Sequence, residues 1–247
     1  GIVGAWVILL RIPFVGVAMS HAAFAGSILG LVLGIDPLVG ALVFCTLSAI
    51  LVGPIADRGE LSPNISIGIL FSLVLGIAFM AMGMIEGPKT EALQLLWGSI
   101  LTTTNGDIVL LAATTAVVIA FLLLFHKELK AVIFNREIAR AIGIAERPLF
   151  YGLLVLTGIA VTANLETIGG LLIFSLIVSP ASAAYQLTYR MSRMYLLSVL
   201  FAVVSCLAGI FGSWWLNTPS GASIILMSSA LFGVCLWVSP KRKKAKE

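Results

Sequence analysis

One histidine lies in the middle of an apolar stretch of the sequence. The segment VAMSHAAFAG, residues 17–26, contains His21, one of two histidines in the chain. His21 is about 4–5 Å from the middle of an apolar run over residues 14–34, at the helical rise of about 1.5 Å per residue. An ionisable side chain at that depth in a membrane is costly and is by default a candidate functional group. Imidazole is also a common ligand of divalent transition metals.

The residues around His21 indicate where its helix packs. Ala18, Ala22, Gly26 and Gly30 recur every four residues and form a continuous stripe of small side chains, which allows another helix to approach closely. His21 borders this stripe, so it is expected beside a tight helix crossing. Two interpretations remain open: a neutral imidazole hydrogen-bonded between helices, or a metal ligand whose partners come from elsewhere.

The composition identifies the class of protein that surrounds this histidine. Of the 247 residues, 60% are hydrophobic and 11% are charged, whereas soluble domains carry about 25% charged residues. Apolar runs of about 20 residues match the roughly 30 Å hydrocarbon core, and no alternating barrel strands occur. The sequence therefore predicts an all-α, polytopic transmembrane bundle of eight to nine spans. The expected spans are residues 14–34, 38–56, 64–85, 107–126, 148–163, 168–187, 194–212 and 222–238, after a truncated span at 1–10.

The basic residues support this arrangement and orient it. Alternate threading of the spans places fourteen of the 15 basic residues on one side and only Lys89 on the other, as the positive-inside rule requires. We therefore expect a single transmembrane domain over residues 1–247. The 127–147 loop and the basic tail at 239–247 are expected on the cytoplasmic side, the tail against anionic lipid. The net charge of +4 does not imply nucleic acid.

Two connections are longer than turns. The outer connection, residues 86–107, contains an apolar run from Ala92 to Leu101 that is too short to span and suggests an interfacial or re-entrant helix. The inner connection contains FNREIARAIGI, which predicts a short amphipathic helix that Gly143 ends. The helical spacing of this segment involves Phe134, Ile138 and Ala141, with Arg136, Glu137 and Arg140 around the rest of the turn. This helix could lie on the headgroups or dock on a partner.

Further candidates lie later in the chain. Glu166, in the segment NLETIGG, is either an exposed loop acid or an outer-vestibule residue. Pro180 interrupts a span between two serines, and broken helices of this kind often line transport pathways. The sequence has no phosphate-binding loop, HExxH or CxxC motif, and its three cysteines form no disulfide framework. Any energy for transport must come from a gradient or from another subunit.

Four stretches together resemble one family. They are LLRIPFVGVAMSHAAFAG, LLWGSILTTTNGDI, FNREIARAIGI and ETIGGLLIFSLIVSPASAAYQLT, which occur in the family's order and spacing over nearly the whole chain. The chain is similar to the membrane permease subunit of bacterial and archaeal ABC importers for zinc, manganese or iron(II), of the type II importer fold.

The resemblance implies a non-enzymatic permease in the cell membrane. It implies a second copy of the permease, separate cytoplasmic ABC ATPase subunits, an extracytoplasmic metal-binding protein, and no cofactor other than the transported divalent ion. The coupling helix that contacts the ATPase maps onto Phe134 to Gly143. Its contact residues are then Phe134, Arg136, Glu137, Ile138, Arg140 and Gly143.

The resemblance also assigns a metal ligand and shows one departure. The family's pore histidine maps onto His21, but the aspartate four residues before it is Val17 here. Three possibilities follow: two His21 side chains from two copies form a weaker site, Met19 and Cys45 contribute sulfur ligands, or metal passes without a lasting site. The other pathway candidates are Met19, Ser20, Glu166 and Pro180.

Alternative functions stay open at the sequence level. A permease for a metal chelate such as a siderophore or cobalamin has a related architecture, and a gradient-driven carrier would need no ATPase. A membrane enzyme is disfavoured because no acid and base pair lies within one span. The sequence leaves the identity of the metal open.

Overall fold

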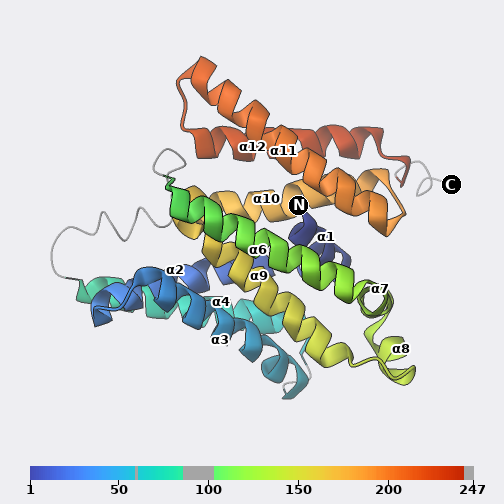
Figure 1. Cartoon of the computed structure of the whole chain (residues 1–247), viewed down its shortest axis with the longest axis horizontal. Helices are drawn as coiled ribbons and strands as arrows, with labels where there is room; N and C mark the ends of the chain where they lie inside the picture. The colour runs from blue at the N-terminus through green and yellow to red at the C-terminus, as the bar shows by residue number, and fades with distance from the viewer. Residues whose placement is uncertain (59–60, 86–102, 242–247) are drawn as a thin grey trace. The chain divides into compact units, whose positions relative to one another are not determined.

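The computed structural model describes residues 1–58, 61–85 and 103–241, and every regular element in these ranges is a helix. Within these ranges, eight helices are long and apolar enough to cross a membrane, which confirms the eight predicted spans (Figure 1). They are α2 (Val15–Leu33), α3 (Pro37–Arg58), α4 (Pro63–Met84), α6 (Asn105–Leu124), α9 (Glu146–Ile168), α10 (Gly170–Leu187), α11 (Met191–Leu216) and α12 (Ser220–Val238). The shorter helices are α1 (Ile2–Leu9), α7 (His126–Phe134) and α8 (Arg136–Ala141). The predicted interfacial run from Ala92 to Leu101 lies outside the described residues.

The helices form two compact units. One unit, Phe14–Gly170, contains α2 to α9, and the other contains Gly1–Pro13 and Leu171–Glu247. We call them the α2–α9 unit and the α10–α12 unit, the latter including α1. Within the α10–α12 unit, the Ser198 hydroxyl on α11 donates to the Gly1 carbonyl oxygen at 2.7 Å, which holds α1 against α11.

Helix α2 is the most enclosed span. In its apolar stretch 72% of the residues are buried, against 11% in that of α6, because α3, α4 and α9 all pack on it. The predicted small stripe forms its contact with α3. A Cβ atom at Gly26 would lie 2.3 Å from the Gly40 carbonyl oxygen, and one at Gly40 would lie 2.4 Å from that of Gly26. The two backbones therefore touch at a point where only glycine fits.

Helices α11 and α12 form a hairpin and cross obliquely (Figure 1). Trp214 and Trp215 at the end of α11 are 81% and 80% exposed, and Trp237 at the end of α12 is 79% exposed. Tryptophan is enriched at both membrane interfaces, where the ring meets headgroups and hydrocarbon. The exposed indoles therefore place the two ends of this hairpin at the two interfaces.

The boundary between α9 and α10 differs from the expected loop. Helix α9 continues to Ile168, and Asn164 lies in it, with its side-chain amide donating to the Ala160 carbonyl at 2.7 Å. Only Gly169, at φ 75°, separates the two helices. The expected break between the predicted spans 148–163 and 168–187 is wrong, because the residues between them continue α9 and the helix ends only at Gly169.

Two prolines lie inside spans. Pro180 is internal to α10, as expected, and Pro54 is internal to α3, which continues to Arg58. Each ring removes one backbone donor from its helix. Prolines are tolerated inside membrane-spanning helices when the freed backbone groups find other partners.

The start of the basic tail is fastened to the end of α10. The Ser239 hydroxyl donates to Gln186, at 3.0 Å from its carbonyl oxygen. The Lys241 ammonium donates to the Tyr185 carbonyl and lies 3.5 Å from the Tyr185 ring centroid and 4.7 Å from that of Tyr189. Partial burial lowers the pKa of Lys241. These contacts fix the point from which the tail leaves the membrane-spanning part of this unit.

The contact between α2 and α3 can be tested with the smallest possible substitution. Gly26→Ala should destabilise the protein by about 1–3 kcal/mol, because its methyl group must displace backbone. Thermal unfolding in detergent is the measurement. Gly76→Ala on α4 is the matched control, since a Cβ atom there meets no atom within 4 Å. Equal unfolding temperatures for the two variants would contradict the backbone contact.

Candidate functional site

His21 is held by a hydrogen bond within α2. Its Nδ1 atom lies 2.9 Å from the carbonyl oxygen of Val17. A carbonyl oxygen can only accept, so Nδ1 carries the hydrogen. In the neutral ring, Nε2 then presents its lone pair. The residue that replaces the expected aspartate therefore still orients the imidazole, through its backbone.

Aromatic rings cover one side of His21. The Phe71 ring on α4 meets it edge to face, with centroids 5.0 Å apart and an interplanar angle of 83°. Phe71 meets Phe14 in the same way at 5.3 Å and 78°. His21 is half-buried, and this cluster of Phe14, His21 and Phe71 lies between α2 and α4.

The sulfur atoms lie on another face of α2. Cys45 Sγ is 3.7 Å from Met19 Sδ and 3.5 Å from the Met19 carbonyl oxygen. Both side chains are 1% exposed, and Gly158 of α9 packs against them. Two residues along a helix correspond to about 200° of rotation, so Met19 points away from His21. The structure brings Met19 and Cys45 together but not to the imidazole.

The remaining predicted pathway residues do not gather at His21. The Ser20 hydroxyl donates to the Gly16 carbonyl oxygen at 2.8 Å within α2. Pro180 belongs to the other compact unit, and the side chain of Glu166 lies outside the described residues. Among the described residues, no three His, Cys, Asp or Glu side chains group in a way that could hold a metal ion. Within this part of the chain, His21 stands without a carboxylate or thiolate partner.

The predicted coupling helix is two helices. Helix α7 ends at Phe134 and α8 begins at Arg136, with Asn135 in extended backbone between them. The Asn135 side-chain oxygen accepts from the amides of Glu137 at 2.8 Å and Ile138 at 3.1 Å. This cap starts a new helix, so a single helix from Phe134 to Gly143 is wrong. Gly143 does follow α8, at φ 83°.

Three large apolar side chains are exposed on this segment. Phe134 is 83%, Ile138 is 50% and Ile142 is 66% exposed. We call them the apolar patch. Ala139 instead turns inward, against Val132 and Leu149. The sequence analysis missed Ile142, although its spacing of four residues from Ile138 was a visible signal.

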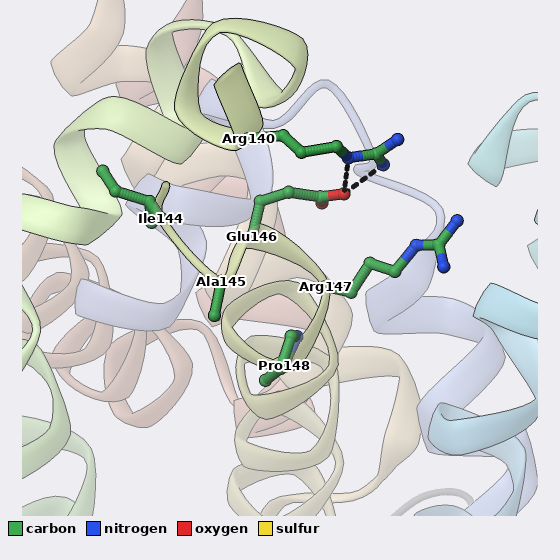
Figure 2. Close-up of a pocket in the computed structure, with 6 residues that line it drawn as sticks. All are labelled: Arg140, Ile144, Ala145, Glu146, Arg147 and Pro148. Atoms are coloured by element: carbon green, nitrogen blue, oxygen red, sulfur yellow. Dashed lines mark hydrogen bonds and ion pairs between the residues drawn. The ribbon is translucent and has the colours of Figure 1, made fainter. Parts of the chain in front are cut away.

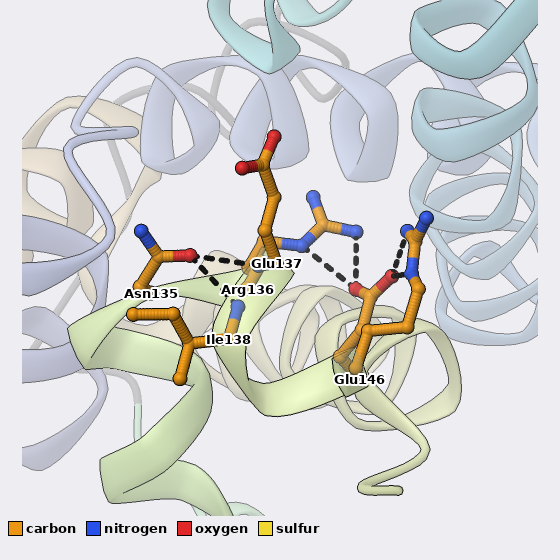
Figure 3. Close-up of polar contacts among 6 residues, drawn as sticks. Asn135, Arg136, Glu137, Ile138 and Glu146 are labelled. Atoms are coloured by element: carbon orange, nitrogen blue, oxygen red, sulfur yellow. Dashed lines mark hydrogen bonds and ion pairs between the residues drawn. The ribbon is translucent and has the colours of Figure 1, made fainter. Parts of the chain in front are cut away.

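A buried carboxylate ties α8 to α9. Glu146, the first residue of α9, is 2% exposed and lies between two arginines of α8 (Figure 3). Arg136 Nε and Nη2 lie 2.9 and 2.7 Å from Glu146 Oε2, and Arg140 donates to Oε1 from Nε at 3.1 Å and from Nη2. We call this group the Glu146 clasp.

The clasp includes two of the charged residues that were predicted to contact an ATPase. The predicted ATPase contact of Arg136 and Arg140 stays a prediction, but both side chains form ion pairs with Glu146. The Arg136 guanidinium also lies 4.1 Å from the Phe150 ring centroid. Glu137 points away from the clasp (Figure 3). A pocket of about 340 Å³ borders the Arg140–Glu146 pair, and Arg147 extends away from Glu146 there (Figure 2).

Comparison with known proteins places the chain in a family. A model described as the ABC 3 transport family matches residues 1–239. The chain belongs to this family. A manganese transport system membrane protein, MntC, from Halalkalibacterium halodurans is 28% identical over 256 residues, covering 100% of this chain and 88% of that protein. A manganese import system permease protein, ScaB, from Streptococcus parasanguinis is 28% identical over 246 residues, with coverage of 100% and 88%.

Solved structures agree with this ABC 3 membership. PsaBC from Streptococcus pneumoniae in complex with Fab superposes with a TM-score of 0.86 at 28% identity, covering 100% of this chain and 90% of that one. An inward-facing putative metal-chelate type ABC transporter gives 0.73 at 16% identity, covering 95% and 82%. The second likeness concerns the fold alone. The all-helical permease fold predicted from the sequence is confirmed.

The hydrogen bond of His21 predicts one tautomer. Nitrogen-15 spectra of histidine-labelled protein in lipid should show a protonated Nδ1 and an unprotonated Nε2 for this residue, because Val17 offers only an acceptor. His126→Gln removes the other histidine signal and provides the assignment. A neutral ring protonated at Nε2 would contradict the described geometry.

Proposed function

We propose that this chain is the membrane-spanning permease subunit of an ATP-binding cassette importer that moves a divalent transition metal ion, manganese before zinc or iron(II), into the cytoplasm. The observation that carries the proposal is the full-length similarity to proteins named as manganese transport permeases, within the ABC 3 family. His21 is the histidine that lies inside a membrane span, whereas His126 begins α7 outside the spans.

His21 is the proposed ion contact on the pathway. A metal-binding histidine usually donates its other ring N–H to a carbonyl or carboxylate, which fixes the tautomer and the ring orientation. The bond from Nδ1 to the Val17 carbonyl supplies this arrangement and leaves Nε2 for the ion. A second His21 from another copy of the chain would add a second nitrogen. Without a carboxylate the ion is held weakly, which suits a carrier that must release its cargo.

Energy would enter through the coupling segment, α7 and α8. Cytoplasmic ATPase subunits would dock on the apolar patch, whose three side chains are exposed despite their size. An extracytoplasmic binding protein would deliver the ion to the opposite side. The basic residues of the 127–147 loop and of the tail support a cytoplasmic location for both.

Manganese uptake tests this function directly. In vesicles containing the permease, its ATPase subunits and its binding protein, ATP-dependent uptake of radioactive manganese is expected. His21→Ala should lower the initial rate by roughly tenfold or more, the order seen when a metal site loses a supporting contact. Bare manganese, but not a siderophore chelate, should compete with the label.

Two further variants sharpen the interpretation of that uptake experiment. Met19→Leu changes the opposite face of α2 and should leave the rate near the wild-type value. Val17→Asp restores a carboxylate four residues before His21, on the same helix face, and should tighten manganese binding. An unchanged rate for His21→Ala would refute the role of the imidazole, and competition by the chelate alone would favour the chelate importer.

The apolar patch predicts the ATPase contact. Ile138→Asp places a charge in the proposed interface and should reduce the amount of ATPase subunit that co-purifies with the permease. Lys127→Gln, which changes the charge by the same amount at the start of α7, is the control and should retain the partner. Full retention by Ile138→Asp would show that the ATPase docks elsewhere.

A further inference from the structure

The Glu146 clasp joins two elements that have little else in common. Helix α8 has six residues, too few to be stable without tertiary contacts. Its inward packing comes from Ala139, which contacts Val132 of α7 and Leu149 of α9. Both of its arginines converge on the carboxylate of Glu146, so the position of α8 relative to α9 depends on that carboxylate (Figures 2 and 3).

The chemistry of the clasp makes it rigid. Guanidinium groups present planar, directional donors, and each arginine engages the carboxylate through two nitrogen atoms. Glu146 is 2% exposed, so separating it from the arginines would leave a buried charge without compensation. Arg136 is further held by the Phe150 ring on the next turn of α9. Helix α8 and the first turns of α9 therefore move together.

Helix α9 in turn bears on the helix that carries His21. It packs against both α2 and α3. A Cβ atom at Gly158 would lie 2.9 Å from Cys45 Sγ and 3.7 Å from Met19 Sδ, and one at Gly53 would overlap the Tyr151 ring. At these two points α9 is in close contact with α2 and α3. A displacement of α9 must therefore be followed by α2 or α3.

We propose that Glu146 is a positioning residue for transport: it locks the coupling segment to α9, so that movement of the apolar patch is transmitted to the helices around His21. Glu146 itself contacts neither the ATPase nor the ion. The inference rests on the proposed importer function, and it assigns to Arg136 and Arg140 an internal mechanical role in place of a docking role.

The test compares transport with ATP hydrolysis in the assembled importer. Glu146→Gln keeps the shape of the side chain and removes its charge. The variant should still co-purify with the ATPase subunits and hydrolyse ATP, but manganese transported per ATP should fall by about tenfold, within the range of coupling between linked sites. Glu146→Asp keeps the charge and should recover part of the ratio. Lys130→Gln, which removes one positive charge from an exposed position on α7, is the matched control and should keep the wild-type ratio.

A second measurement reports on the clasp without transport. Amide hydrogen exchange over residues 136–143 should be faster in Glu146→Gln than in the wild type, while exchange over 150–165 stays the same. If Glu146→Gln fails to assemble, Arg140→Gln, which removes the more exposed arginine, should still lower the manganese to ATP ratio.

Several results would overturn the inference. A wild-type ratio in assembled Glu146→Gln or Arg140→Gln, no recovery in Glu146→Asp, or unchanged exchange over residues 136–143 would each do so. A wild-type complex that takes up no manganese with ATP would instead refute the proposed function. The exchange measurement then still decides whether Glu146 holds α8.

Discussion

The backbone contact between α2 and α3 fixes the helix on which the rest of the α2–α9 unit depends. Because Gly26 and Gly40 carry no side chains, the two helices meet carbonyl to Cα, and α4 and α9 close over the remaining faces of α2. Side chains on α2 consequently have little freedom. Met19 packs against Cys45 of α3 and Gly158 of α9, and His21 packs against Phe71 of α4.

The packing around α2 bears on position 17, where the chain has valine and the family resemblance predicts an aspartate. In hydrocarbon, an aspartate four residues before His21 would need its own compensation. Val17 needs none, and its carbonyl oxygen performs the orienting part of the role by accepting from Nδ1. Because Nδ1 makes this hydrogen bond, only Nε2 of the neutral imidazole presents a lone pair to a ligand. For the ion contact proposed above, the strength of binding would depend on the further ligands that a second element or a second copy offers to an ion at Nε2.

Sequence reasoning succeeded where one physical constraint dominates. All eight spans followed from the length of apolar runs, because the bilayer demands about 20 residues per crossing, and the small stripe correctly indicated a tight crossing. Sequence reasoning failed where a local hydrogen bond overrides the pattern of apolar residues. Asn135 caps a new helix where the sequence suggested a continuous one. Asn164 lies within α9, where its side-chain amide donates to the Ala160 carbonyl oxygen. Glu146 was missed because its partners, ten and six residues earlier, become neighbours only after the chain reverses between α8 and α9.

The two helices of the α11–α12 hairpin have unequal lengths. Helix α12 has 19 residues and α11 has 26, or about 28 and 39 Å at 1.5 Å per residue. The shorter helix matches the thickness of a typical hydrocarbon core, whereas the longer one exceeds it, and the two helices cross obliquely (Figure 1). Hydrophobic mismatch therefore acts on one helix of the pair. A thinner bilayer increases the mismatch of α11 more than that of α12, so the two helices of this hairpin differ in how they respond to the thickness of the lipid around them.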